Sequence, residues 1–191
     1  MRTLKRFGAS AATLSMLLAL TLSAVSARAQ VIQWKNIVGT RQTFDLVGVG
    51  TGQVMGAAPW VTTNGTAKVY LVAGNASFQV SGLVLAVGSV PAVPLSGLLI
   101  GTAAGVTKVK GTLVCNVSGT TSGSTDSVEV DTSPVALDNQ GDAQFNGSFV
   151  SSVPTICSAA PWNTAFLIRI VEPAADADLY IAFGAVLFAD Q

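Results

Sequence analysis

Histidine is absent from this 191-residue chain, and its absence excludes several chemistries at once. Without an imidazole there is no Ser-His-Asp or Cys-His catalytic arrangement, and no histidine-based zinc, copper or non-haem iron site. We therefore expect no catalytic residue, no metal and no cofactor, and a protein that is not an enzyme. The catalysis left open is that of carboxylates, as in glycosidases, and the metal chemistry left open is oxygen-ligated Ca²⁺.

Cysteine is also scarce, with Cys115 and Cys157 alone in the sequence. In an exported protein such a pair predicts a disulfide bond, and we expect it to tie two core strands together. For a closed loop of roughly forty residues, the chain-entropy model gives about 4 kcal/mol of stabilisation. The alternatives are two free buried thiols or a metal-binding pair, and the second lacks a histidine to complete a zinc site.

Charged residues make up only 10% of the chain, and the N-terminal segment holds bases without acids. Arg2, Lys5 and Arg6 precede an apolar run from Ala9 to Val25, and Ala27-Arg28-Ala29 follows it. A basic start, a short apolar stretch and small residues at the exit are typical of a secretory signal peptide. The alternative is a membrane anchor, which needs about 20 strongly apolar residues, whereas small and hydroxyl residues interrupt this run.

We therefore predict a signal peptide over residues 1–29, cleaved after Ala29, and one secreted domain over residues 30–191. The protein is expected to be secreted, periplasmic or displayed at the cell surface, with no transmembrane anchor. Four of the ten bases lie in residues 1–29, so six bases face ten acids in the remainder, a net charge of about −4. That balance argues against nucleic acid and against docking on anionic lipid.

Helical periodicity is missing beyond residue 29, and short β-type runs recur between turn residues. This pattern predicts an all-β fold, a single antiparallel β-sandwich of about eight strands. Asn64-Gly65 predicts a hairpin turn, because both residues tolerate positive φ. The predicted strands are Gln42–Val49, Thr66–Val72, Ser77–Ala86, Thr107–Val117, Ser127–Asp131, Asp142–Ser151, Ala165–Val171 and Asp178–Phe188.

An apolar connection runs from Val87 to Gly105 and contains two prolines. A solvated loop of this composition would expose an apolar patch, so we expect it either to fold back over one end of the sandwich, covering a sheet edge, or to contact a partner. Trp34, near the start of the predicted domain, is the tryptophan that we expect to be exposed. The candidate ligand or partner surface therefore comprises Trp34, Val90, Pro91, Val93, Pro94 and Leu95.

Two further features have competing interpretations. Trp60 and Trp162 each follow a proline, and they either plug the ends of the core or form a platform on which sugars stack. The segment from Asp138 to Asp142 has oxygen ligands around a glycine, so it is either a weak Ca²⁺ loop or a solvated turn.

Several short motifs follow one another along the chain, namely Pro59-Trp60-Val61, Gly82-Leu83-Val84-Leu85, Leu113-Val114-Cys115, Ser133-Pro134, Gly141-Asp142-Ala143, Cys157 and Tyr180-Ile181-Ala182-Phe183. In this order they resemble a family of small exported bacterial proteins of unknown function, of an actinobacterial type. The resemblance covers most of residues 30–191 and departs over Val87–Gly105. It supports the sandwich and the disulfide and implies no activity.

Taken together, these features predict an exported, non-enzymatic binding or structural protein of the cell envelope or extracellular space. Its partner is an unidentified molecule, such as a cell-surface polymer or protein, that a sheet face, a loop end or a sheet edge would contact. The alternatives are a carboxylate-dependent enzyme acting on polysaccharide and a small outer-membrane β-barrel, and the second lacks evident aromatic girdles.

Overall fold

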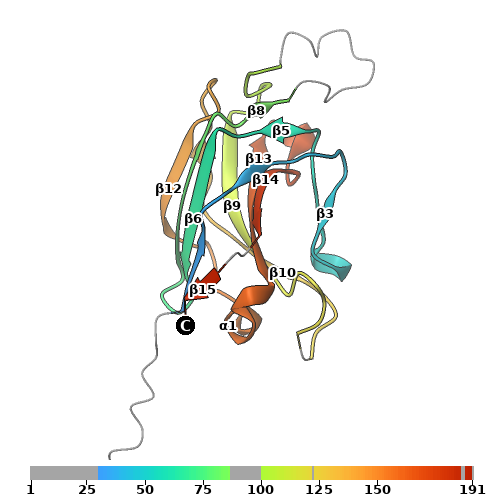
Figure 1. Ribbon diagram of the computed structural model, residues 1–191, viewed down its shortest axis with the longest axis vertical. Helices are drawn as coiled ribbons and strands as arrows, with labels where there is room; N and C mark the ends of the chain where they lie inside the picture. The colour runs from blue at the N-terminus through green and yellow to red at the C-terminus, as the bar shows by residue number, and fades with distance from the viewer. Residues whose placement is uncertain (1–29, 87–99, 122, 186–187, 191) are drawn as a thin grey trace, which may run out of the picture.

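Two antiparallel β-sheets face each other in the computed structural model, which describes residues 30–86, 100–121, 123–185 and 188–190 (Figure 1). Sheet A has the strand order β12-β7-β6-β1-β15. Sheet B has the order β10-β9-β13-β14-β2, and β11 also pairs with β9. The prediction of an all-β antiparallel sandwich is therefore confirmed.

The strands of sheet A are β1 (Val31–Trp34), β6 (Asn64–Tyr70), β7 (Asn75–Ser81), β12 (Ala143–Ser148) and β15 (Phe188–Asp190). The strands of sheet B are β2 (Val38–Gly39), β9 (Lys108–Cys115), β10 (Val128–Asp131), β11 (Val135–Ala136), β13 (Thr164–Glu172) and β14 (Tyr180–Ala185). Two small ribbons pair β3 (Leu46–Val47) with β4 (Val54–Met55) and β5 (Trp60–Val61) with β8 (Val84–Leu85). The helical segments are η1 (Gly50–Gly52), α1 (Thr155–Ala159), η3 (Pro161–Asn163) and η4 (Ala174–Asp176).

Each of the eight predicted stretches contains or overlaps at least one strand, but several boundaries differ. Only Leu46–Val47 of the predicted strand Gln42–Val49 is extended and paired, and Ser77–Ala86 is divided between β7 and β8. The short strands β1, β2, β4, β5 and β11 were not predicted. Most of these have only two residues, too few for a period of two to be visible.

The predicted hairpin turn at Asn64-Gly65 is wrong, because both residues begin strand β6. Gly65 pairs with Val80, and a Cβ atom at Gly65 would lie 2.7 Å from the carbonyl oxygen of Ile37. The glycine is therefore needed for a close approach between backbones. The turn between β6 and β7 instead ends at Gly74, whose φ is 67°.

The main core lies between the two sheets and is built from alternate residues of the facing strands. Trp34 of sheet A packs against Phe166 of sheet B, with ring centroids 5.5 Å apart, and Phe78 meets the same ring at 5.8 Å. Gly111 makes room for these rings, because a Cβ atom there would lie 2.6 Å from Phe166. The interior positions of both sheets are thus occupied by aromatic and branched side chains, as the sandwich requires.

A second apolar cluster lies on the outer face of sheet B, beneath the ribbon of β3 and β4, which forms the right-hand layer in Figure 1. Val54 of the ribbon packs there with Leu167 and Tyr180. Tyr180 is fully buried, and its hydroxyl makes no hydrogen bond within the described residues. Burial, and to a lesser extent the charge of Asp45, raises the pKa of Tyr180 to about 12.

Tyr180 should therefore make stability fall at alkaline pH. Because the phenol's folded pKa is above its unfolded value of about 10, its contribution is complete below that pH and is lost as the pH rises towards 12. Denaturant unfolding measured between pH 10 and 12 should show a steeper fall for the native sequence than for Tyr180→Phe. Equal pH dependence in the two proteins would contradict the burial of this hydroxyl.

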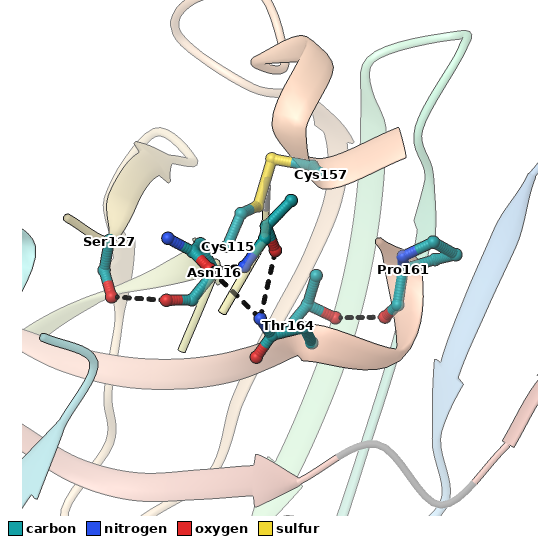
Figure 2. The surroundings of a disulfide bond; sticks show 8 residues. Cys115, Asn116, Ser127, Cys157, Pro161 and Thr164 are labelled. Atoms are coloured by element: carbon teal, nitrogen blue, oxygen red, sulfur yellow. Dashed lines mark hydrogen bonds between the residues drawn. A yellow bond between two sulfur atoms is a disulfide. The ribbon is translucent and has the colours of Figure 1, made fainter. Parts of the chain in front are cut away.

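The disulfide between Cys115 and Cys157 is confirmed, with both residues fully buried and their Cα atoms 5.0 Å apart (Figure 2). The expectation that it ties two core strands together is wrong in one respect. Cys115 ends strand β9, but Cys157 lies in the short helix α1. An isolated helix of five residues is not stable in water, so the cross-link anchors α1 to sheet B.

The structure also bears on cellular location. A disulfide is consistent with an exported protein, because thiols are kept reduced in the cytosol. Within the described ranges, no helix is long and apolar enough to cross a membrane. Residues 1–29 lie outside the described residues, so the signal peptide stays a prediction.

Candidate functional site

The outer faces of the two sheets differ in what covers them. The ribbon of β3 and β4 covers part of sheet B, whereas in the described chain the outer face of sheet A is left open to solvent (Figure 1). Its outward positions are exposed or half-buried along β6, β7 and β12. Its inward positions are buried along β6 and β7, and buried or half-buried along β12. The open face of sheet A is thus the broad surface that the fold leaves available for a ligand.

Strand register aligns the outward side chains of sheet A in rows that run across the strands. One row joins Gln33 of β1, Lys68 of β6, Ser77 of β7 and Asn146 of β12. A neighbouring row contains Thr66, Gln79 and Gln144, and a third contains Val31, Tyr70, Asn75 and Ser148. Neighbouring strands lie about 4.8 Å apart and successive rows about 6.6 Å apart, so the side chains form a regular grid.

The grid is hollowed at its centre. A depression with a volume of about 350 Å³ lies over the middle of sheet A. A second depression of about 380 Å³ adjoins it towards Asp138 and Asp142, and both share Gln79 and Gln144. The first depression is lined by Gln33, Trp34, Lys35, Thr66, Ala67, Lys68, Ser77, Phe78, Gln79, Gln144, Phe145 and Asn146.

The outward side chains of this face are mostly uncharged amides and hydroxyls, which both donate and accept hydrogen bonds. Within the described chain, the side chains of Gln33, Thr66, Gln79, Gln144 and Asn146 make no hydrogen bond to the protein. Their hydrogen-bonding capacity is therefore free for water or for a ligand. We call this set of outward residues on β1, β6, β7 and β12 the polar face.

One aromatic ring and one cation lie together on the polar face. The ammonium group of Lys68 lies 4.8 Å from the centroid of the Tyr70 ring, a cation–π contact. The lysine therefore covers part of the ring surface on which a ligand could stack. Recognition on this face has to depend on hydrogen bonds and charge more than on aromatic stacking.

The structure contradicts the expectation that Trp34 is exposed. Trp34 is 1% exposed, and its ring packs against Phe166 of the opposite sheet. The strand that carries it borders the depression, but its ring points into the core and cannot stack with a ligand. Trp60 is 4% exposed and fills space in the core, as one of the two interpretations expected. Trp162 is 68% exposed and therefore does not fill the core.

The remaining predicted surface residues, namely Val90, Pro91, Val93, Pro94 and Leu95, lie outside the described residues. The end of the same connection is described and returns to the sandwich. Ala103 is buried in the core, and the amide of Leu85 donates to the carbonyl of Thr102 at 2.9 Å. The described end of the connection thus folds back onto the sandwich, which is one of the two outcomes that we expected. The role of the connection as a partner surface stays a prediction.

The segment from Asp138 to Asp142 has the hydrogen bonding of a turn. The Asp138 carboxylate accepts hydrogen bonds from the amides of Gln140 and Asp142, each at 2.9 Å, and the Asp142 carboxylate accepts one from Gly82. One oxygen of each carboxylate, Oδ1, thus accepts hydrogen bonds from backbone amides, as in a solvated turn. Among the residues placed by the structure, no group of three potential metal ligands is found.

The carboxylates on sheet B are committed to ion pairs. Arg169 of β13 contacts Glu129 and lies 3.3 Å from Asp178 and 3.7 Å from Asp131. Lys110 of β9 lies 2.8 Å from both Asp131 and Asp178. Burial alone would lower the pKa of Lys110, but hydrogen bonds to Asp131 and Asp178 raise it. The hydrogen bond from Lys110 in turn lowers the pKa of Asp178.

Comparisons of the chain with protein-family models, with curated proteins and with solved structures find no match. The resemblance to an exported actinobacterial-type family therefore stays a prediction. The polar face was not predicted as a site, although its signal was present. The alternate residues Thr66, Lys68 and Tyr70, and then Gln144 and Asn146, are polar in the sequence, but only the strand register brings them into shared rows.

Proposed function

We propose that this chain is an exported, non-enzymatic binding protein that holds a polysaccharide of the cell envelope or extracellular space on the polar face of sheet A. The single observation that carries the proposal is the set of amide and hydroxyl side chains that line a depression and make no hydrogen bond to the described residues, namely Gln33, Thr66, Gln79, Gln144 and Asn146. Sugar hydroxyls also both donate and accept, so such a grid is complementary to them.

The geometry of the face favours an extended ligand over a small compact one. Sites for drug-sized molecules are concave and mostly apolar, whereas this depression is open and eight of its twelve lining residues are polar. A polymer that lies across the strands would meet a new side chain about every 4.8 Å. Many weak hydrogen bonds along one chain would then add to a useful affinity.

The arrangement of the acids supports a role without catalysis. Carboxylate catalysis uses a pair in which the environment raises the pKa of one member. In the described chain, the pKa values of Asp178 and Glu172 are both lowered, chiefly by the hydrogen bonds that Lys110 donates to Asp178 and that Lys108 donates to Glu172. These carboxylates stay ionised and serve ion pairs on sheet B, away from the polar face.

The experiment that tests this function is a glycan array followed by affinity measurement on the glycans bound. Gln79 and Gln144 are direct cross-strand partners in the depression, so Gln79→Ala with Gln144→Ala removes two adjacent amides. We expect a loss of affinity of at least about tenfold, because two hydrogen bonds at about 1 kcal/mol each are removed.

The matched control is Gln42→Ala with Gln53→Ala, which removes two exposed glutamines outside sheet A. The control should bind like the native protein, and both double variants should keep the native stability to within about 1 kcal/mol. If no glycan binds, or if both double variants bind as well as the native protein, the polar face is not a polysaccharide site.

A further inference from the structure

The distribution of cations over the fold indicates which polysaccharides the polar face selects. Of the six basic residues in the described chain, Lys108, Lys110 and Arg169 pair with carboxylates. Lys35 and Lys68 make no ion pair with any residue that the structure describes, and both line the depression on sheet A. Three of these six basic residues thus form ion pairs on sheet B, and two of the other three lie at the candidate site.

A shortage of acids does not explain why these lysines lack partners. Acids outnumber bases by ten to six in residues 30–191, but none of the residues that line the first depression is acidic. The acidic residues Asp138 and Asp142 line the second depression instead. The two lysines therefore lie at the first depression and the two carboxylates at the second.

The surroundings of Lys68 suit a carboxylate group. Lys68 is half-buried and stands between Gln33 and Ser77 in its row, with Asn146 one strand further. An anion above the row could accept a charge-assisted hydrogen bond from the ammonium group and further bonds from the amide groups beside it. Charge-assisted bonds are roughly twice as strong as neutral ones, so a lysine in this row would contribute more to the binding of an anion than the neutral side chains beside it.

We infer that the polar face binds an acidic polysaccharide, one whose sugars carry carboxylates, and that Lys68 is the residue that selects it. This inference rests on the proposed function, since it assigns a substrate class to the same site. A neutral glycan would leave the positive charges of both lysines uncompensated. A nucleic acid is disfavoured, because the domain as a whole is acidic.

The test compares one backbone with and without its charge. An oligogalacturonate and its methyl ester differ only in whether the carboxylates are free, and calorimetry measures the affinity for each. We expect the free acid to bind at least about tenfold more tightly than the ester, and to weaken as salt is raised. A sulfated oligosaccharide and its neutral parent form a second pair, which distinguishes carboxylate recognition from attraction to any anion.

Variants at Lys68 separate charge from shape. Lys68→Gln should weaken binding of the free acid by about tenfold and change binding of the ester by less than twofold, and Lys68→Arg should restore most of the affinity. The control Lys108→Gln removes an exposed lysine on sheet B and should have no effect.

The outcomes distinguish this inference from the proposed function. Equal binding of acid and ester, lost in the Gln79→Ala and Gln144→Ala variant, overturns the acidic ligand and leaves the polysaccharide site intact. Tight binding of the acid that survives in Lys68→Gln overturns the role of Lys68. Binding of the sulfated oligosaccharide as tightly as the carboxylated one overturns carboxylate selection, and binding of no glycan overturns both proposals.

Discussion

Replacing Cys115 and Cys157 together with alanine should lower the free energy of unfolding by about 4 kcal/mol. The disulfide closes a loop of 42 residues, so its removal gives the unfolded chain a large gain in conformational entropy. Because small domains are stable by only about 5–15 kcal/mol, this is among the largest effects expected from any change in the chain. Denaturant titration of the double variant beside the native protein measures it.

The contacts beside the disulfide explain why the loss of stability should be largest in the neighbouring segments. The next residue, Asn116, is fully buried with a φ of 59°, and its carbonyl accepts a hydrogen bond from Ser127 (Figure 2). Its side-chain amide donates to the carbonyls of Ser124 and Asp126, and its oxygen accepts from the amide of Thr121. The loop from 117 to 127 therefore depends on the end of strand β9.

Hydrogen exchange of the double variant should accordingly accelerate first in α1 and in the loop from 117 to 127. Strands β7 and β12 of sheet A, which do not pair with the strand that carries Cys115, serve as the internal reference. A stability loss below about 1 kcal/mol, or faster exchange distributed evenly over both sheets, would contradict this account of the disulfide.

Arg169→Met should lower the free energy of unfolding by about 2–3 kcal/mol. The Arg169 side chain is 9% exposed and contacts three carboxylates. Its removal leaves Asp131 and Asp178 paired with Lys110 alone and takes from Glu129 its ion-pair partner. Breaking a fully buried ion pair costs about 3–5 kcal/mol, and the partial exposure of these carboxylates reduces the expected value. Thermal and denaturant unfolding measure the change.

The same variant should respond differently to acid. The pKa of Asp178 is lowered in the folded protein, so its contribution is present above the unfolded value of about 3.9 and is lost as the pH falls through the folded value. The hydrogen bond from Lys110 is the largest cause of this lowering and remains in Arg169→Met, whereas the charge of Arg169 contributes a smaller part that the variant loses. The native protein should therefore lose slightly more stability below pH 4 than Arg169→Met, and the difference in stability between the two proteins should narrow. The control is Arg41→Met, at an exposed arginine without an ion pair to the described residues. A gap that stays constant from pH 7 to pH 3 would contradict the ion-pair assignment.

The class of fold could be predicted because its signals are local. Alternation along Thr66–Val72 and Asp142–Ser151 identified two strands of sheet A and the face of each that is buried. The disulfide was predicted from the number of cysteines and from the predicted export. Strand pairing could not be predicted. Asn64-Gly65 has the chemistry of a hairpin turn, but the glycine lies inside a strand, where the lack of a side chain allows a close approach to Ile37.

The site was predicted less well than the fold, for a physical reason. Trp34 was expected to be exposed because polar residues follow it, but it occupies an inward position on β1 and fills the space between the sheets. The polar face instead consists of ordinary glutamine, asparagine, serine and lysine residues from four strands. None is distinctive by itself, and only the register places Gln79 beside Gln144 and Lys68 between Gln33 and Ser77.

Two-dimensional amide NMR of the purified protein, titrated with oligogalacturonate, tests the central claim most directly. The account predicts shifts confined to the backbone of β1, β6, β7 and β12 and to the side-chain amides of Gln33, Gln79, Gln144 and Asn146, with sheet B unchanged. Shifts confined to sheet B, to the ribbon of β3 and β4 or to the loop ends would contradict it, as would an unchanged spectrum at millimolar ligand.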